Sequence, residues 1–414
     1  MNAIDIGGAT WRPAFTDDPH PFFAEQRVPA PVSRGELDGV PVWLITRYDD
    51  VRRLLADPSV SSDPRHAGPA AGAVPWVGAN NPNVLTRHIV RLDHPGHTRL
   101  RKLVVRAFTA RRVEAMRPRV QQITDELVAR LLPRGRADLV SDFALPIPIT
   151  VISELLGVPE DGRQQFLSWG NIYLGVDEGD IGRRPEAVGH LSEYLGGLID
   201  RKSGQHADGA EDASLLDALI AVRDEGDRLS HDELLAMAFL LLIAGYETTA
   251  GLIGNGMLAL LHHPDQLAAL RADPARIGAA IEEFLRYNTP VKVPALRFTT
   301  AEIEVADAVI PAGEALVLFL SAANRDPGRF HNAGELDIGR DASGHVGFGH
   351  GMHFCLGAPL ARLEGETAFT ALLTRFSGLA LSPGGPVWRH SFQLHSLKSL
   401  PVTFTPVPAA PQLP

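Results

Sequence analysis

The amino-acid sequence predicts a mainly α-helical protein with a small β portion, folded as one domain over residues 1–414. Three observations predict this class. Apolar residues recur at helical spacing over 98–132 and 149–198, an apolar segment runs from 230 to 262, and alternating apolar residues occur mainly between 298 and 319. No internal repeat or clear linker divides the chain, which is long enough to bury a sizeable core.

The first elements are short. Val40 to Ile45 is an apolar stretch that predicts a strand, and Tyr48 to Leu55 predicts a helix after it. The segment from Ser61 to about Asn83 is rich in Gly, Pro, Ala and Asn and has no periodicity, so we expect a long loop, which is usually functional or disordered. The helical regions that follow are interrupted by turns at Pro159 and at 175–184.

The longest helix is expected to begin at Ser230, which forms a capping box with Glu233, and to end at His262. The thirteen residues 234–246 carry no charge, so a membrane span is one interpretation. A span needs about 20 apolar residues, and a glutamate inside it costs roughly 2.5–3.5 kcal/mol. Glu247 therefore favours a helix of roughly 45 Å buried in the protein core, and we expect no membrane span.

The C-terminal part adds two helices and small strands. One helix is expected to begin at Asp273-Pro274, with proline in its first position, and to end before Pro290. Residues 298–319 alternate and turn, which predicts short strands, and a last helix follows Cys355. The proline-rich residues 406–414 are expected to form a loose tail.

Composition excludes several classes of protein. The 414 residues include 49 acidic and 39 basic residues, for a net charge of −10, and a single cysteine. One cysteine excludes an internal disulfide framework and any metal centre that needs several cysteines of this chain. The acidic balance argues against a nucleic-acid partner. Residues 1–15 show no secretory signal, so we expect a cytoplasmic enzyme.

The most specific segment surrounds the single cysteine. A glycine-rich turn that begins at Gly347 delivers Cys355 to the start of a helix, where backbone N–H groups and the helix dipole favour a thiolate. Gly351 and Gly357 lack side chains, which would let a flat group approach the backbone. His353 adds a possible cation. The alternative interpretation is a buried, inert cysteine.

This segment resembles the signature of the cytochrome P-450 family of haem-thiolate monooxygenases. Phe348, Gly351, His353, Cys355 and Gly357 match that signature completely. The resemblance extends over about residues 42–404 and is greatest to the soluble bacterial branch. It implies the cytochrome P-450 fold, with a long central helix over haem b. Cys355 would be the axial ligand of the haem iron, and a thiolate in that role favours O–O cleavage. Phe348, Gly349 and Gly357 would contact the cofactor.

The central helix carries a second match, from Ala244 to Thr248. A buried acid and hydroxyl are costly without a role, and Gly245 costs about 1 kcal/mol relative to alanine unless a kink or a close ligand requires it. Thr248 could bond back to the carbonyl of Ala244. The resemblance implies that Ala244 and Gly245 contact the cofactor and that Glu247 and Thr248 deliver protons to dioxygen. Many bacterial relatives have histidine where this chain has Tyr246.

Further matches concern the surroundings of the haem. Glu283 and Arg286 fit the family's Glu-x-x-Arg pair, a structural ion pair beneath the haem that Arg340 would join. Phe108 would pack near the porphyrin. The haem propionates need cations, which the resemblance assigns to His97, Arg101, Arg297 and His353. Arg297 follows a strand expected over residues 290–296. Taken singly, each cation could also be an ordinary surface charge.

One basic segment suggests a docking surface for an electron donor. Between His97 and Val120 there is one acid, Glu114, and there are eight basic residues, which give a local charge of +7: Arg99, Arg101, Lys102, Arg106, Arg111, Arg112, Arg117 and Arg119. Complementary charge steers protein encounters, so an acidic donor is expected, unless the segment is only a solvated helix face. The resemblance points to a ferredoxin, with ferredoxin reductase and NAD(P)H behind it.

The resemblance implies insertion of one oxygen atom of O2 into a hydrophobic organic substrate, by hydroxylation or epoxidation, in bacterial natural-product biosynthesis. The substrate pocket would include Leu242, Ile243, Val293, Phe392 and Leu394, with loops at 61–90 and 166–197. Two alternatives stay open. One is peroxide-driven or atypical oxidative chemistry on the same fold, and the other is a non-catalytic haem-based sensor. Neither a nucleic acid nor a membrane is an expected partner.

Overall fold

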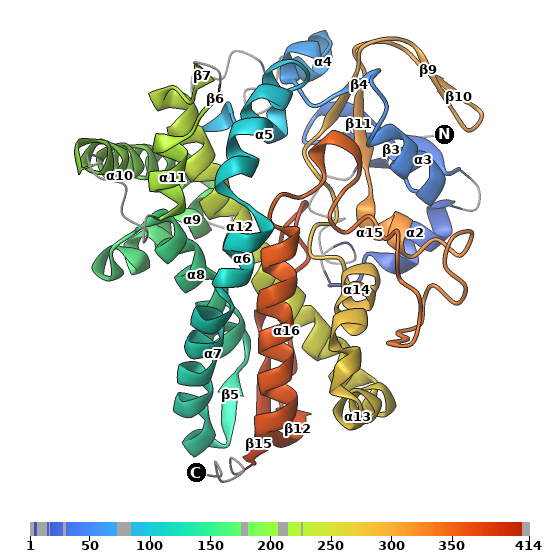
Figure 1. Ribbon diagram of the computed structural model, residues 1–414. Coiled ribbons are helices and arrows are strands. Elements are labelled where there is room, and N and C mark those ends of the chain that lie inside the picture. Colours follow the sequence, from blue (N-terminus) through green and yellow to red (C-terminus); the bar gives the residue numbers. More distant parts are fainter. Residues whose placement is uncertain are drawn as a thin grey trace.

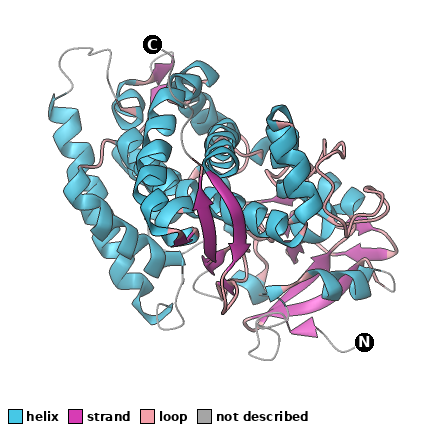
Figure 2. Cartoon of the chain, turned by 90° about the horizontal axis from the view of Figure 1, so that it is seen from below, coloured by secondary structure: helices cyan, strands magenta, loops and turns pink. Residues whose placement is uncertain are grey.

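The fold is described from a computed structural model of the chain, for residues 4–5, 15, 17–27, 30–72, 84–174, 181–205, 214–224 and 227–407. Helices occupy most of the molecule, and the largest sheet lies at the side near the N-terminus (Figures 1 and 2). The expected class, mainly α-helical with a small β portion, is confirmed.

The central helix α12 (His231–His262) is the longest helix among the described residues. It begins where the sequence predicts, because the Ser230 hydroxyl and the Glu233 carboxylate satisfy each other's backbone N–H groups. α12 is long and apolar enough to cross a membrane, but 72% of its most apolar window is buried inside the protein. It is therefore the core helix of the fold, packed in the largest hydrophobic cluster.

Most of the other helices pack around α12, and the rest lie beside the largest sheet (Figure 1). Those before it in the chain are α2 (His20–Arg27), α3 (Tyr48–Leu54), α4 (Pro69–Gly72), α5 (Gly96–Ala107), α6 (Ala110–Ala115), α7 (Arg117–Leu131), α8 (Pro146–Leu156), α9 (Arg163–Leu174), α10 (Arg184–Gln205) and α11 (Leu215–Ala221). Those after it are α13 (Pro264–Ala272), α14 (Ile277–Tyr287), α15 (Leu320–Asn324) and α16 (Ala358–Arg375).

The largest sheet has the strand order β1-β2-β3-β11-β8-β4. Its strands are β1 (Ile4–Asp5), β2 (Val32–Leu37), β3 (Val40–Ile45), β4 (Val60–Ser61), β8 (Arg297–Thr299) and β11 (Ala315–Leu318). Smaller sheets pair β6 (Arg223–Asp224) with β7 (Asp227–Arg228), β9 (Ile303–Val305) with β10 (Ala308–Ile310), β13 (Val387–Trp388) with β14 (Leu397–Ser399), and β5 (Arg136–Asp138) with β12 (Phe376–Leu381) through β15 (Pro401–Pro406).

Three local expectations were wrong or incomplete. Residues 290–296 form no strand beyond an isolated bridge at Val291, because two prolines lack the N–H that a ladder needs. Asp273 makes no side-chain cap, and a 3₁₀ turn precedes α14. Pro406 closes β15 instead of beginning a tail, and residues 408–414 of the expected tail lie outside the described residues.

Candidate functional site

The cysteine loop places Cys355 just before α16. The Cys355 N–H donates to the carbonyl of Phe348 at 2.9 Å, which closes the loop on itself. Gly349 and Gly351 adopt φ angles of 73° and 72°, which L side chains disfavour. A Cβ on Gly351 would lie 2.8 Å from the Leu55 carbonyl oxygen. Glycine is therefore needed here so that the backbone at the C-terminal end of α3 can pack against the cysteine loop. The expectation that Gly351 makes room for a flat ligand is therefore replaced by a packing requirement.

The Cys355 side chain is exposed although the surrounding protein desolvates its thiol. Burial raises the pKa of Cys355, while the N–H groups of Gly357 and Ala358 and the charges of Arg101 and Arg362 act against that increase. The protein alone therefore does not produce the thiolate expected from the helix start. A bound metal ion would, since coordination deprotonates a thiol.

Two arginines and two histidines from three separate elements converge beside this loop. The rings of His97, on α5, and His353 lie with centroids 4.5 Å apart. Arg101, also on α5, donates to the Phe354 carbonyl at 2.8 Å, and the charge of Arg297, on β8, lowers the pKa values of both histidines. The four side chains predicted to bind the propionates are thus brought together.

Burial outweighs the acidic influence on this cluster, the charge of Asp93 on His97 and Arg297. Burial lowers the pKa of Arg297 to about 10 and that of His353 to about 3. Both ring nitrogens of His97 are buried without a hydrogen-bond partner among the described residues. A group with two carboxylates placed here would satisfy these side chains, so the residues fit the propionates of a haem next to the Cys355 thiol. Ser62, which contacts His353 Nε2 at 2.9 Å, is a partner that sequence reasoning missed.

The middle of α12 has an accessible face around Ala244 and Thr248. Ala244 is exposed and Thr248 is half-buried, although most of the surrounding helix is buried. The Thr248 hydroxyl donates to the Ala244 carbonyl at 2.7 Å, as expected. A Cβ on Gly245 would lie 3.2 Å from Ile152, so this glycine is explained by contact with α8 and not by an approaching cofactor.

Glu247 is buried beside Thr248 and has partners from the C-terminal part of the chain. Its Oε1 atom accepts a hydrogen bond from Ser396 at 2.7 Å and lies 3.0 Å from Arg389 Nε. Tyr246 is fully buried, and its hydroxyl donates to Asn171 on α9 at 3.0 Å. Burial raises the pKa of Tyr246, so the residue that replaces the expected histidine stays neutral.

A second buried acid, Glu364 on α16, was not singled out from the sequence. Burial raises its pKa to about 8, and its hydrogen-bond partner is the hydroxyl of Thr249. This contact joins α16, which begins just after the cysteine loop, to the middle of α12. The sequence feature that could have predicted this site is an acidic residue on the otherwise apolar, buried face of the last helix.

The predicted structural pair is confirmed as a contact. Arg286 and Glu283 are fully buried and joined by two hydrogen bonds of 2.6 and 2.8 Å, and Arg340 lies 3.4 Å from Glu283. Arg286 also donates to the carbonyls of Asn324, Ala333 and Glu335. This network links α14 to the loop that precedes the cysteine segment.

The remaining predicted residues divide by accessibility. Ile243, Phe392 and Leu394 are half-buried, whereas Leu242 and Val293 are fully buried in the core. Phe108 ends α5 and is buried, and the half-buried ring of Phe348 lies under the Arg362 guanidinium, 4.6 Å from its centroid. Parts of the predicted pocket loops, at 73–83 and 175–180, lie outside the described residues.

The basic segment carries less free charge than its sequence suggests. Among the described residues, at least three of its eight cations form ion pairs with carboxylates, most of which come from distant parts of the chain. Lys102, Arg106 and Arg111 have exposed side chains. The pairs are Arg99 with Asp227 and Glu233, Arg117 with Glu114 and Glu366, and Arg119 with Glu154.

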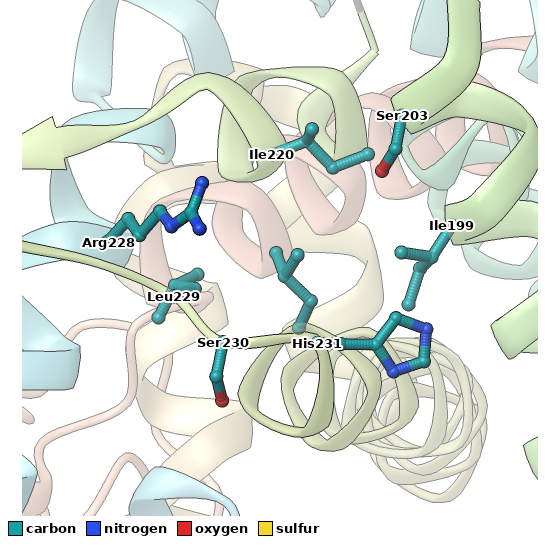
Figure 3. A pocket seen from close by; sticks show the side chains of 8 residues that line it. Ile199, Ser203, Ile220, Arg228, Leu229, Ser230 and His231 are labelled. Atoms are coloured by element: carbon teal, nitrogen blue, oxygen red, sulfur yellow. The ribbon is translucent and has the colours of Figure 1, made fainter.

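A separate pocket of about 400 Å³ lies at the N-terminal end of α12. Side chains from α10, α11 and α12 line it, including Ile199, Ile220 and His231 (Figure 3). His231 precedes Glu247 by sixteen residues on the same helix, or roughly 24 Å at 1.5 Å per residue. This pocket is therefore distinct from the site around Cys355.

An exposed thiol at a helix start, a nearby cluster of arginines and histidines, and a hydroxyl–acid pair on a long core helix fit a protein that binds haem. A comparison with family models matches residues 149–401 to cytochrome P450. The chain belongs to the cytochrome P450 family, and it is an oxygen-incorporating oxidoreductase of that family. Membership implies a haem cofactor and the use of O2.

Several bacterial relatives resemble the whole chain. The cytochrome P450 monooxygenase PikC of Streptomyces venezuelae is 48% identical over 94% of this chain and 91% of its own length. The vitamin D(3) 25-hydroxylase of Pseudonocardia autotrophica is 47% identical over 95% of each chain. The solved structure of the P450 monooxygenase TamI bound to tirandamycin C matches 97% of this chain with a TM-score of 0.86 at 40% identity.

Proposed function

We propose that this protein is a haem b monooxygenase that oxidises a large hydrophobic natural product, using electrons that pass from NAD(P)H through a ferredoxin reductase and a ferredoxin. The observation that carries this proposal is the convergence of His97, Arg101, Arg297 and His353 beside the exposed Cys355 thiol. The charge of Asp93 acts on His97 and Arg297 but does not offset the effect of their burial, whereas two propionates would supply acceptors for the cluster.

The roles of the individual residues follow from their positions. Cys355 would ligate the iron, and the four cations would seat the propionates. When bound, the haem supplies the iron at which O2 is activated, with thiolate ligation favouring O–O cleavage. Thr248 would hold its hydroxyl toward the accessible side of α12, and Glu247 would exchange protons there.

The substrate class rests on apolar accessible residues and on the relatives. Ile243, Phe392 and Leu394 present half-buried apolar surface, which suits a hydrophobic molecule. Two of the relatives are named for a substrate or bound ligand, vitamin D(3) and tirandamycin C. We therefore favour hydroxylation or epoxidation of a polyketide-, steroid- or terpenoid-like molecule in natural-product tailoring.

The proposed electron donor is an acidic ferredoxin in the cytoplasm. Lys102, Arg106 and Arg111 are exposed on α5 and α6, near the loop in which the Phe354 carbonyl meets Arg101. A positive surface this close to the metal ligand would shorten the path of the incoming electron and speed the encounter with an acidic partner.

A carbon-monoxide difference spectrum of the dithionite-reduced protein tests the assignment. We expect the strongly red-shifted Soret band of thiolate-ligated haem, and its loss in Cys355→Ala. A band at the position of a neutral ligand in the wild type would overturn the assignment.

Turnover then separates the alternatives. With spinach ferredoxin, its reductase and NADPH, a panel of vitamin D3, a macrolactone and myristic acid should yield an oxygenated product. Thr248→Ala should retain the Soret band and release more hydrogen peroxide. Product formed with hydrogen peroxide alone would favour the peroxide-driven enzyme, and no turnover with either oxidant would favour the sensor.

A further inference from the structure

The chain returns to α12 after the last long helix and packs directly against the turn that carries Glu247. A Cβ on Gly251, one turn beyond Glu247, would lie 3.2 Å from Pro290 Cβ and 3.3 Å from Ser396 Cβ. One turn further along, Asn255 donates to the His395 carbonyl at 2.7 Å. Because Gly251 has no side chain, residues 395–396 can pack closely against α12, and the hydrogen bond from Asn255 holds them there.

This returning segment places a hydroxyl donor and a guanidinium charge beside one oxygen of the Glu247 carboxylate. The Arg389 contact is an ion pair, because Arg389 Nε makes no hydrogen bond among the described residues. Ser396 donates to Oε1 at 2.7 Å, and Arg389 Nε lies 3.0 Å from the same atom. The side chains of Arg389 and Glu247 are only 8% and 2% exposed. The Arg389 N–H also donates to the Ser396 carbonyl at 3.0 Å, so the two residues are fixed relative to each other.

The second oxygen of Glu247 is left without a partner. Oε2 is buried and makes no hydrogen bond with any described residue. Leaving a buried carboxylate oxygen unsatisfied is costly, and a native fold tolerates it chiefly where the group has a further task. Glu247 is therefore held through Oε1, and Oε2 is available to exchange a proton.

The loop between the two anchors carries proposed substrate contacts. Phe392 and Leu394 lie between Arg389 and Ser396 in the chain, and Leu394 forms a bridge with Val291. A molecule that pushed on this loop would act on the same short segment that orients Glu247.

We propose that Arg389 and Ser396 are positioning residues that orient Glu247 for proton delivery. This inference rests on the proposed function. Overall, RH + O2 + 2 e⁻ + 2 H⁺ gives ROH + H2O, with the electrons supplied by NADPH through the ferredoxin. Glu247 passes a proton from Oε2 toward the Thr248 hydroxyl and recovers one from water, while Arg389 and Ser396 keep Oε1 in place.

The test compares two oxidants on Arg389→Met, with 7-ethoxycoumarin as the probe substrate. In RH + H2O2 → ROH + H2O the oxidant already carries its protons, so that arm bypasses the delivery step. We expect ferredoxin-driven product formation to fall about tenfold and peroxide-driven formation by less than about twofold. The expected loss is smaller than the roughly 100- to 10,000-fold contribution of general acid–base catalysis, because Glu247 itself remains. The solvent deuterium isotope effect on NADPH consumption should rise. Arg389→Lys should restore part of the lost rate, and Ser396→Ala should show a smaller loss.

Controls distinguish positioning from a merely structural role. His390→Ala changes the exposed neighbour of Arg389 and should match the wild type in both arms. On a Glu247→Gln background, Arg389→Met should have no further effect, because it acts through the missing carboxylate. Equal losses in the two arms, or additive losses in the double variant, would overturn the proposal. The proposed function fails separately, through loss of the red-shifted carbon-monoxide band in the wild type.

Discussion

Replacing Arg297 by methionine should have opposite effects on the haem-free and the haem-bound protein. Arg297 is 3% exposed, and among the described residues its guanidinium donates a hydrogen bond of 3.3 Å to the Ala295 carbonyl. Burial lowers its pKa from 12.5 to about 10, with a smaller opposing effect from Asp93. At about 1.4 kcal/mol per pKa unit, the buried charge costs the haem-free fold about 3 kcal/mol.

The sign of this effect follows from linkage. The pKa is lower in the folded than in the unfolded state, so the penalty is fully present below pH 10 and shrinks only as pH rises through 10. At pH 7, Arg297→Met therefore removes the whole penalty and should stabilise the haem-free protein. In the haem-bound protein the same change removes a charge-assisted bond to a propionate worth roughly 1.5–3 kcal/mol, or about 10- to 100-fold in haem affinity.

Two assays measure the two effects. Urea unfolding of the haem-free protein should show a higher midpoint in Arg297→Met, and haem transfer to excess apomyoglobin should be faster. Arg325→Met is the matched control. Burial also lowers the pKa of Arg325 to about 10, but it donates to the Tyr287 and Gly334 carbonyls, away from the cluster. Arg325→Met should destabilise both forms without accelerating haem transfer. If Arg297→Met destabilised the haem-free protein and left haem transfer unchanged, the reasoning would be refuted.

Three further predictions follow from the buried and the exposed charges. Burial raises the pKa of Glu364 to about 8, so folding stability should fall as pH rises from about 4.5 to 8. Glu364→Gln should flatten this pH dependence in urea titrations, and an unchanged pH dependence would contradict the prediction. Arg286→Leu leaves Glu283 buried without its main partner and should cost about 3–5 kcal/mol in the same assay, whereas a loss below about 1 kcal/mol would argue against a buried pair. The double change Arg111→Glu/Arg112→Glu should slow ferredoxin-dependent reduction and weaken its salt dependence in stopped-flow measurements, and rates equal to the wild type at low salt would exclude this surface.

The long helix was predictable from the sequence because its boundaries are local. Ser230 and Glu233 cap each other within one turn, and the helix ends just before Pro264. The cysteine loop was predictable for the same reason, since its glycines and ligand residues are neighbours in the chain. A local sequence pattern does not predict which distant residue will contact a buried group. Arg389 meets Glu247 from more than a hundred residues away, and no spacing rule connects the two.

The basic segment shows the same limit for electrostatics. Counting charges between His97 and Val120 gives +7, but Arg119 is paired with Glu154 and Arg99 with Asp227. The acids come from other elements, so a charge count within one segment overestimates the field that a docking partner meets.

The cluster around Arg297 is expected to destabilise the haem-free fold and to be stabilised when the cofactor binds. Arg297 is buried with only a smaller opposing effect from Asp93, both ring nitrogens of His97 are unbonded among the described residues, and His353 beside them is desolvated. Each of these arrangements costs free energy that only an anion at this place returns. Because the same side chains surround the loop that holds Cys355, the energy released on pairing them also fixes the metal ligand in position. Binding of the cofactor and ordering of the thiol are therefore expected to be coupled, and Arg297→Met should weaken both together.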